Sequence, residues 1–142
     1  MITSVDKVIF LKGVELFSEL PGRELLSLAT IAEEVLLKRG MEIFREGDQG
    51  DSLFVVVRGE VEVRRGGRSV AVVSERETFG EMALLDGEPR SATVTPMVDG
   101  VALRIERETF FELLATRREI AMGVIRILTR RLRRSHPGGG TG

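Results

Sequence analysis

The stretch from Phe79 to Val94, with the sequence FGEMALLDGEPRSATV, restricts the fold of this chain more than any other part of it. Gly80 permits a backbone turn, and residues 81–85 are good helix formers, so a one-turn helix is expected there. Residues 86–89, DGEP, have the composition of a turn. Residues 91–94 then read as a strand. The fold must therefore accommodate a turn, a short helix, a second turn and a strand in quick succession.

The chemistry of the same stretch predicts a phosphorylated sugar as the ligand. A helix N-terminus offers unpaired N–H groups that suit an anion. Arg90 adds a planar, permanently charged fork for the same anion. Ser91 supplies a hydroxyl donor, and the small side chain of Ala92 leaves the backbone accessible. Glu81 cannot bind an anion, but its carboxylate can accept a hydrogen bond from a sugar hydroxyl.

These residues closely resemble the phosphate-binding cassette of the cyclic nucleotide-binding domain. That domain occurs in regulatory subunits of cAMP-dependent kinase, in cyclic nucleotide-gated channels and in bacterial catabolite activators. The resemblance implies that Glu81 holds the ribose 2′-OH and that Arg90 pairs with the cyclic phosphate. The ligand-binding residues that it implies are Gly80, Glu81, Met82, Ala83, Leu84, Arg90, Ser91 and Ala92. The alternative is that Arg90 forms a surface ion pair with Glu88 and that Glu81 is a solvated helix residue.

The composition is that of an ordinary globular protein, and it excludes several kinds of site. The 142 residues are 42% hydrophobic and 30% charged, which fits a single domain with one core. The absence of cysteine excludes disulfides, iron–sulfur clusters and thiol redox sites. The only histidine is His136, so a histidine-based metal site or catalytic triad is not expected. The net charge of −1 argues against a general nucleic-acid-binding surface.

Neither a membrane segment nor a signal peptide is expected in this chain. No apolar run approaches the length that spans a bilayer, and the first residues lack the pattern of a secretory leader. We therefore expect a cytoplasmic location.

Helices are predicted near the N-terminus. Residues 5–11 form a short segment with an apolar side. Pro21 stands where a helix can begin, because proline is tolerated at the first helical position. Apolar residues continue at helical spacing from there to residue 34. Both helices are interpreted as scaffold.

Strands are predicted from Val35 onward, where glycines separate runs of β-branched and apolar residues. The Gly66-Gly67 pair stands between two such runs and predicts a tight hairpin. The predicted strands are residues 35–37, 42–44, 52–58, 61–65, 68–73, 91–96 and 101–105. Seven or eight short strands at this spacing indicate a sandwich or a barrel.

The expected fold class is mainly β with flanking α-helices. The resemblance covers nearly the whole chain and implies a jelly-roll-type β-roll of about eight strands, with N-terminal helices and C-terminal lid helices. It assigns residues 1–136 to one cyclic nucleotide-binding domain, and the glycine-rich residues 137–142 are expected to form a flexible tail. Residues 50–54 also resemble a second recurring stretch of the family.

Two helices are predicted after Ile105. Residues 109–114 form a short one, and the sequence TRRE at 116–119 has the form of a capping box that opens a longer one. On residues 119–134 one face carries the apolar residues Ile120, Val124, Ile125, Leu128 and Leu132. The resemblance implies that this helix is a lid over the base, and sometimes a dimer contact. The candidate lid contacts are Leu128, Arg131 and Leu132. The arginines fit a solvated helix face better than a nucleic-acid-binding one.

Among three classes of function, a ligand-sensing regulatory module fits the sequence best. An enzyme is not expected, because no nucleophile–base pair or metal cluster is visible. A transcription factor of the catabolite-activator type would need a helix-turn-helix after the lid helix. The chain stops at a glycine tail instead, so we expect no DNA binding and an effector domain or protein outside this chain. A homodimer remains open. The alternative is a degenerate domain that acts as a protein-interaction or dimerisation scaffold.

The expected ligand is a cyclic nucleotide, with cAMP preferred over cGMP and with no cofactor or metal. In the family that this chain resembles, cGMP-selective members often carry threonine directly after the arginine, where this chain has Ser91. The serine hydroxyl does not exclude cGMP, but it lacks the methyl group that restricts a threonine rotamer. Binding is expected to shift the chain towards a closed state, because the cassette packs on residues 109–114, which carry the final helix over the base.

Overall fold

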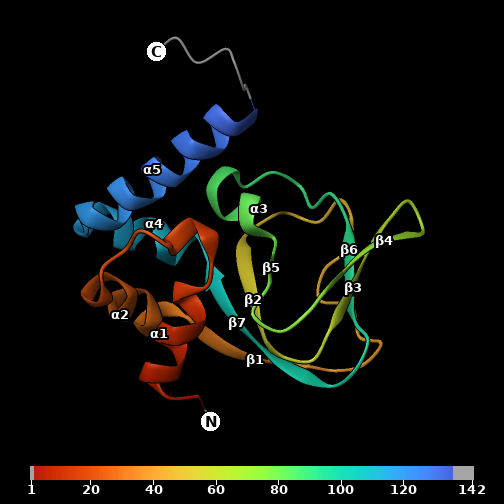
Figure 1. Cartoon of the computed structure of the whole chain (residues 1–142). Coiled ribbons are helices and arrows are strands. Elements are labelled where there is room, and N and C mark those ends of the chain that lie inside the picture. The colour runs from red at the N-terminus through yellow and green to blue at the C-terminus, as the bar shows by residue number, and fades with distance from the viewer. Residues whose placement is uncertain (1, 136–142) are drawn as a thin grey trace.

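Two antiparallel sheets and a group of helices make up the computed structural model, which describes residues 2–135 (Figure 1). One sheet has the strand order β1-β7-β2-β5 and the other β4-β3-β6. The strands are β1 (Glu33–Leu37), β2 (Ser52–Arg58), β3 (Val61–Arg65), β4 (Arg68–Val73), β5 (Thr78–Phe79), β6 (Thr93–Pro96) and β7 (Gly100–Glu106). This arrangement confirms the predicted mainly β class with flanking helices, with seven strands among residues 2–135 where about eight were expected.

The helices lie mostly on one side of the roll. They are α1 (Ser4–Lys12), the single-turn η1 (Glu15–Phe17), α2 (Gly22–Ile31), α3 (Glu81–Asp86), α4 (Arg107–Thr116) and α5 (Arg118–Ser135). Figure 1 shows α1, α2, α4 and α5 grouped together beside β1, β2 and β7, whereas α3 lies at the end of the roll. No helix among the described residues has the length and apolar character needed to cross a membrane.

Strand β2 connects the two hydrophobic cores of the molecule. Successive side chains of a strand point to opposite faces. Phe54 and Val56 therefore pack inside the roll, while Leu53 and Val55 pack against the helices. This double burial explains why the sequence of β2 is a nearly continuous apolar run rather than an alternating one.

The Gly66-Gly67 hairpin was predicted correctly. Strands β3 and β4 pair in antiparallel register on either side of it, and both glycines have positive φ, at 59° and 79°. A two-residue turn with positive φ at both positions matches the twist of the flanking strands and favours glycine. The predicted N-terminal helix is also confirmed, and Thr3 caps α1 by accepting from the backbone N–H of Asp6.

Two predicted strands were wrong in extent. Residues 42–44 form only an isolated bridge, between Phe44 and Val94, instead of a strand. The strand expected from residue 91 begins at Thr93. Arg90 explains the later start, because its N–H donates to Asp48 O and its carbonyl accepts from Gly47 N–H, so this backbone is engaged with a loop.

Three predictions about the helices also need correction. Helix α2 ends at Ile31, because Glu33 and Glu34 pair with β7 instead of continuing the helix. Pro21 is the N-cap of α2 and not its first helical residue. Thr116 opens no capping box, since it is the last residue of α4 and its hydroxyl donates to Leu113 O.

The buried face of α5 also differs from the predicted one. It carries Ile120, Gly123, Val124 and Ile127, so that Ile125 is 53% exposed. Gly123 allows a close approach, because a Cβ there would lie 2.5 Å from Leu20 Cδ2. His136 and the predicted tail at 137–142 lie outside the described residues.

Candidate functional site

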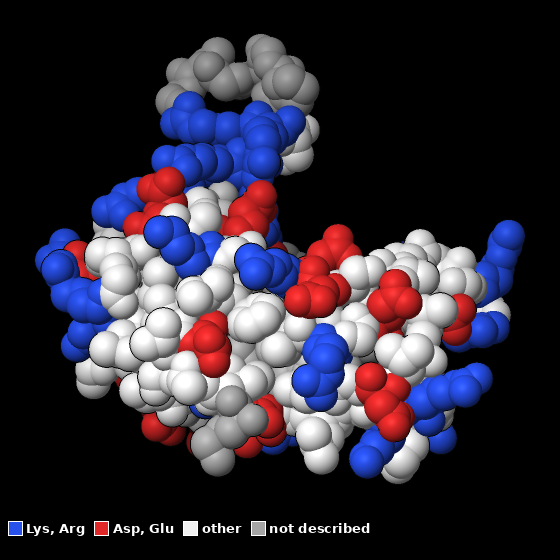
Figure 2. Space-filling model, turned by 60° about the horizontal axis from the view of Figure 1, so that its bottom comes forward, with Lys and Arg blue, Asp and Glu red and all other residues white. Residues whose placement is uncertain are grey.

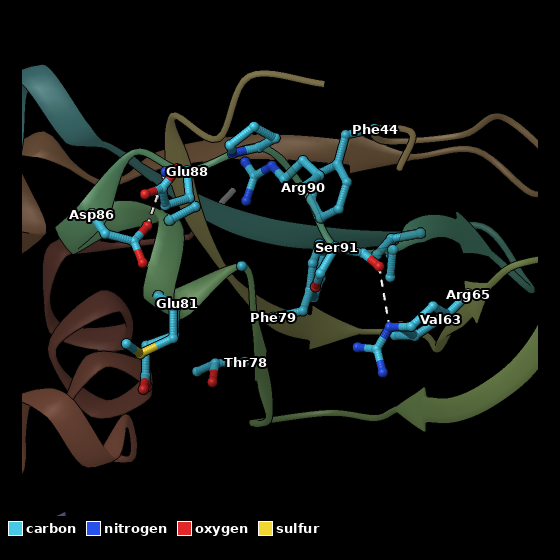
Figure 3. A pocket seen from close by; sticks show the side chains of 16 residues that line it. Phe44, Val63, Arg65, Thr78, Phe79, Glu81, Asp86, Glu88, Arg90 and Ser91 are labelled. Carbon is cyan, nitrogen blue, oxygen red and sulfur yellow. Dashed lines mark hydrogen bonds between the residues drawn. The ribbon is translucent and has the colours of Figure 1, made fainter. Parts of the chain in front are cut away.

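A pocket of about 410 Å³ opens between α3, the segment that follows it and one face of the roll (Figure 3). Its size lies within the range of roughly 300–1,000 Å³ that is usual for small-molecule sites. Its lining is Phe44, Val63, Arg65, Thr78, Phe79, Gly80, Glu81, Met82, Ala83, Asp86, Glu88, Pro89, Arg90, Ser91, Ala92 and Val94. The pocket therefore combines an apolar floor from the roll with acidic and basic side chains around it.

Gly80 allows α3 to begin directly beside Arg90. Its φ of +75° lies in the left-handed region, which a side chain disfavours. A Cβ at this position would also lie 2.6 Å from Arg90 Nη1 and 2.9 Å from Ser52 O. Both the turn and the close contact therefore require glycine. The sequence had indicated the turn but not the contact.

Arg90 is buried, with only 6% of its surface exposed. Its Nη1 donates to Ser52 O at 3.0 Å, and its Nη2 donates to Ser52 Oγ at 3.2 Å. Nη2 also lies 3.4 Å from Asp51 Oδ1. The alternative of a surface ion pair with Glu88 does not describe this residue.

The guanidinium of Arg90 is not fully compensated by these contacts. Its Nε is buried and finds no hydrogen-bond partner among the described residues. Its Cζ lies 3.9 Å from the centroid of the Phe44 ring, a cation–π contact. Burial lowers the pKa of Arg90 below its ordinary value, while Asp51 and Asp48 act in the opposite direction. A buried cation of this kind is stabilised by an anion that approaches it.

The loop before β2 holds the segment that carries Arg90. Arg90 N–H donates to Asp48 O at 2.7 Å, and Gly47 N–H donates to Arg90 O at 2.8 Å. Gly50 permits this contact, because a Cβ there would lie 2.2 Å from Glu88 O. The loop and β2 thus fix both the backbone and the side chain of Arg90, a role that the sequence alone did not indicate.

Glu81 lies on the α3 side of the pocket and already has a cationic partner. Its Oε1 lies 2.5 Å from Arg131 Nη2, and the Glu81 side chain is 16% exposed. Arg131 Nε also donates to Glu15 Oε1 at 2.6 Å. Partial burial lowers the pKa of Arg131, but hydrogen bonds to Glu15 and Glu81 outweigh it, so that the net shift is upward. One carboxylate has about four lone-pair sites, so Glu81 can accept a further hydrogen bond.

Most of the predicted site residues come together in this pocket. Gly80, Glu81, Met82, Ala83, Arg90, Ser91 and Ala92 all line it. Leu84 does not, because its side chain is fully buried in the core beneath the helices. Seven of the eight predicted ligand-binding residues therefore line one pocket.

The predicted lid residues lie outside the pocket lining. Leu128 is partly buried against the helical core, and Leu132 is 62% exposed. Only Arg131 reaches the site, through its contact with Glu81.

Sequence reasoning missed the roll's contribution to the pocket. Phe44, Phe54 and Phe79 form an aromatic cluster, with ring centroids 4.9–6.0 Å apart. Val63 and Arg65 project from β3 into the same pocket. The only available signal was the alternation of Val61, Val63 and Arg65 before the glycine pair, which marks a common face but not what it faces.

Comparison with known proteins gives one consistent result. The family model of the cyclic nucleotide-binding domain matches residues 34–117. The chain is 28% identical over 137 residues to a CRP-like cAMP-activated global transcriptional regulator of Mycobacterium tuberculosis, covering 93% of this chain and 60% of the relative. It is 34% identical over 128 residues to the cyclic AMP receptor protein of Thermus thermophilus, covering 87% and 59%.

A solved structure agrees with these relatives. The N-terminal domain of a transcriptional regulator from Streptomyces coelicolor A3(2) superposes with a TM-score of 0.86 at 35% identity, covering 94% of this chain and 99% of that one. This chain thus spans about three fifths of the length of the two bacterial regulators.

Proposed function

The chain belongs to the cyclic nucleotide-binding domain family, and we propose that it is a regulatory module that senses a cyclic nucleotide, with cAMP preferred over cGMP. The observation that carries the proposal is the buried Arg90, whose Nε has no partner among the described residues and which shares a pocket with Glu81. The names of the two bacterial relatives, one cAMP-activated and one a cyclic AMP receptor, support the choice of ligand.

In this proposal the two charged residues hold the two ends of the sugar phosphate. Arg90 pairs with the cyclic phosphate, and Ser91 and Ala92 donate to it. Glu81 accepts from the ribose 2′-OH, while Gly80 and the backbone of residues 82–84 shape the cradle. An arginine fork suits a phosphate because it can donate two parallel hydrogen bonds.

The proposed preference for cAMP depends on Ser91. A serine hydroxyl has more rotamer freedom than a threonine hydroxyl, so holding it towards a guanine amino group costs more entropy. We expect a preference on the order of 1 kcal/mol, a factor of several to ten. Ser91→Ala tests whether the serine hydroxyl addresses the base or only the phosphate. If cGMP binds equally well or more tightly, the preference is refuted, and Ser91→Ala should then abolish that advantage.

Signal transmission is assigned to α5. Arg131 on this helix contacts Glu81, so a ligand that engages Glu81 changes the surroundings of Arg131. If the nucleotide binds one position of α5 better than another, the population shifts by that difference in affinity and no more. Leu128, Arg131 and Leu132 are the proposed lid contacts over the base.

The response belongs to an effector domain or protein outside this chain. We assign no catalytic role and no DNA contact to the chain, place it in the cytoplasm and include a homodimer through α5 in the proposal. A second candidate function is a scaffold that no longer binds nucleotide. The presence of both Arg90 and Glu81 in the pocket favours the sensor.

Calorimetric titration separates the two candidates. A sensor releases or absorbs heat on titration with cAMP and saturates at one site per chain. A scaffold shows no saturable binding of either cAMP or cGMP.

A further inference from the structure

Arg65 is the second arginine of the pocket, and the sensor role described above gives it no task. Figure 3 shows Arg65 on the β3 side of the pocket and Glu81 on the α3 side. Arg65 lines the pocket together with Val63, two residues earlier on the same face of β3. Arg64 lies on the opposite face, where it contacts Glu62 and Gly67 O.

The side chain of Arg65 is exposed, and one hydrogen bond orients its guanidinium while the other donors can reach a ligand. Its Nε donates to Ser91 O at 3.1 Å, which ties it to the cassette (Figure 3). Among residues 2–135, Arg65 forms no ion pair with a carboxylate. A planar fork that is already oriented loses little conformational freedom when it donates further hydrogen bonds.

Arg65 lies on the side of the pocket where the base of the proposed ligand would bind. Because the proposed function places the phosphate at Arg90 and the ribose at Glu81, the part of the pocket lining that it leaves for the base is the β3 side, with Val63 and Arg65. The outer edge of a purine presents the N7 acceptor, to which guanine adds O6, whereas adenine adds the N6 amino donor. An N–H group of arginine complements N7, the acceptor that both bases share.

We propose that Arg65 is a specificity-determining residue that donates to N7 of the bound purine and so distinguishes purine from pyrimidine cyclic nucleotides. This inference rests on the proposed function, which it extends from the sugar phosphate to the base. Because both purines carry N7, this contact admits cAMP and cGMP alike and leaves the proposed preference between them to Ser91.

The test uses 7-deaza-cAMP, which replaces N7 by a C–H group. Wild-type protein should bind cAMP about tenfold more tightly than 7-deaza-cAMP, as expected for one hydrogen bond from a charged donor. Arg65→Leu should bind cAMP about tenfold more weakly than wild type and should bind both nucleotides equally. Arg64→Leu is the matched control, because it removes a neighbouring arginine from the other face of β3, and it should keep the wild-type ratio.

The ratio of the two affinities separates base recognition from a structural role. If Arg65 only supported the backbone at Ser91 O, Arg65→Leu would weaken the binding of both nucleotides alike and keep the wild-type ratio of affinities. That result would overturn the inference. Equal binding of cAMP and 7-deaza-cAMP by wild type overturns it as well, while leaving the sensor role intact. Absence of binding of any cyclic nucleotide by folded wild type refutes the sensor role itself.

Discussion

Arg90 connects the cassette to residues 44–52, a stretch that is distant from it in sequence. Its side chain contacts Ser52 at the start of β2 and the ring of Phe44, and its backbone is paired with residues 47 and 48. The burial of this charge is only partly compensated, because Nε lacks a partner among the described residues. Phosphate binding would supply the missing charge and acceptor.

The first prediction concerns the strength of this phosphate contact. Arg90→Ala should weaken cAMP binding by about 2–4 kcal/mol, or roughly 30- to 1,000-fold, because a charge-assisted fork is lost. Arg90→Lys should also weaken binding, since a point charge does not replace the fork. Calorimetry measures both, with Arg68→Ala as a control that removes an exposed arginine outside the pocket lining. Unchanged affinity in a folded Arg90→Ala variant would refute the assignment.

The second prediction concerns Glu81 and the ribose. Wild type should bind 2′-deoxy-cAMP about 1–3 kcal/mol less tightly than cAMP, because the carboxylate loses a hydrogen-bond donor. Glu81→Gln should reduce this difference, since an amide oxygen accepts a weaker hydrogen bond than a carboxylate. If wild type binds both nucleotides equally, Glu81 does not contact the 2′-OH and serves only as the partner of Arg131.

The residues of the cassette could be predicted from sequence because their chemistry is local in the chain. Glu81, Arg90, Ser91 and Ala92 stand within one short stretch, and all of them line the pocket. The contributions of Phe44 and Arg65 could not be predicted in this way. Only the closing of the roll brings these residues to the cassette, and no periodicity in the sequence records that contact.

Among the elements, α5 is held to the rest of the molecule by ion pairs to η1 and to the residues that follow it. Arg131 pairs with Glu15, Arg130 with Glu19, and Arg134 lies 3.5 Å from Glu15. Arg117, between α4 and α5, pairs with the buried Glu24 of α2 at 2.9 Å. Helix α5 therefore has a defined position from which a ligand could move it.

The third prediction is that α5 contributes to nucleotide affinity. A chain that ends before Ile125 should retain phosphate recognition but bind cAMP more weakly, because the proposed lid and the Arg131–Glu81 contact are removed. Circular dichroism checks the fold and calorimetry the affinity. If truncation unfolds the chain, the full-length variant Arg131→Gln tests the same contact. Equal binding by a folded truncated chain would reduce α5 to a scaffold or dimer element.

The fourth prediction concerns the pH dependence of the attachment of α5. The hydrogen bond from Arg131 holds the pKa of Glu15 below its ordinary value. A lowered folded-state pKa means that the contact stabilises the protein above the ordinary glutamate pKa of about 4.3, and that this stabilisation is lost as the pH falls through the lower folded pKa. Urea unfolding should therefore show a small deficit for Glu15→Gln at neutral pH that disappears in acid. A deficit independent of pH would contradict this account.

Element boundaries were harder to predict than element types. Residues 33 and 34 are glutamates with good helix propensity, and helical spacing seemed to continue through them. Pairing with β7 makes them part of β1 instead, because tertiary contacts override a weak local preference. The hairpin at Gly66-Gly67 was predictable because its turn is specified by two adjacent residues.

At the scale of the whole molecule, α5 extends beyond the roll and carries most of the basic side chains at that end. Figure 2 shows Lys and Arg gathered along the upper part of the molecule, whereas acidic and basic residues are mixed elsewhere on this face. The helix also exposes two apolar residues one heptad apart, Ile125 at 53% and Leu132 at 62%. Residues seven apart lie on one face of a helix, as in coiled-coil contacts.

The fifth prediction is that this face mediates a homodimer. Sedimentation velocity should give a dimer for the wild type and a monomer for the double variant Ile125→Asp, Leu132→Asp, because the introduced carboxylates of the two chains would be buried without partners. The exposed Val70→Asp on β4 is the control and should leave the dimer intact. A monomeric wild type would show that the apolar face of α5 is not a dimer contact.

Titration calorimetry of the purified chain with cAMP, and separately with cGMP, decides whether this pocket senses a cyclic nucleotide. We expect saturable binding at one site per chain, with cAMP tighter by a factor of several to ten, which corresponds to about 1 kcal/mol. The same titration of Arg90→Ala should show the largest loss among the variants described. A folded wild-type protein that binds neither nucleotide would contradict the claim that this pocket is a cyclic nucleotide sensor.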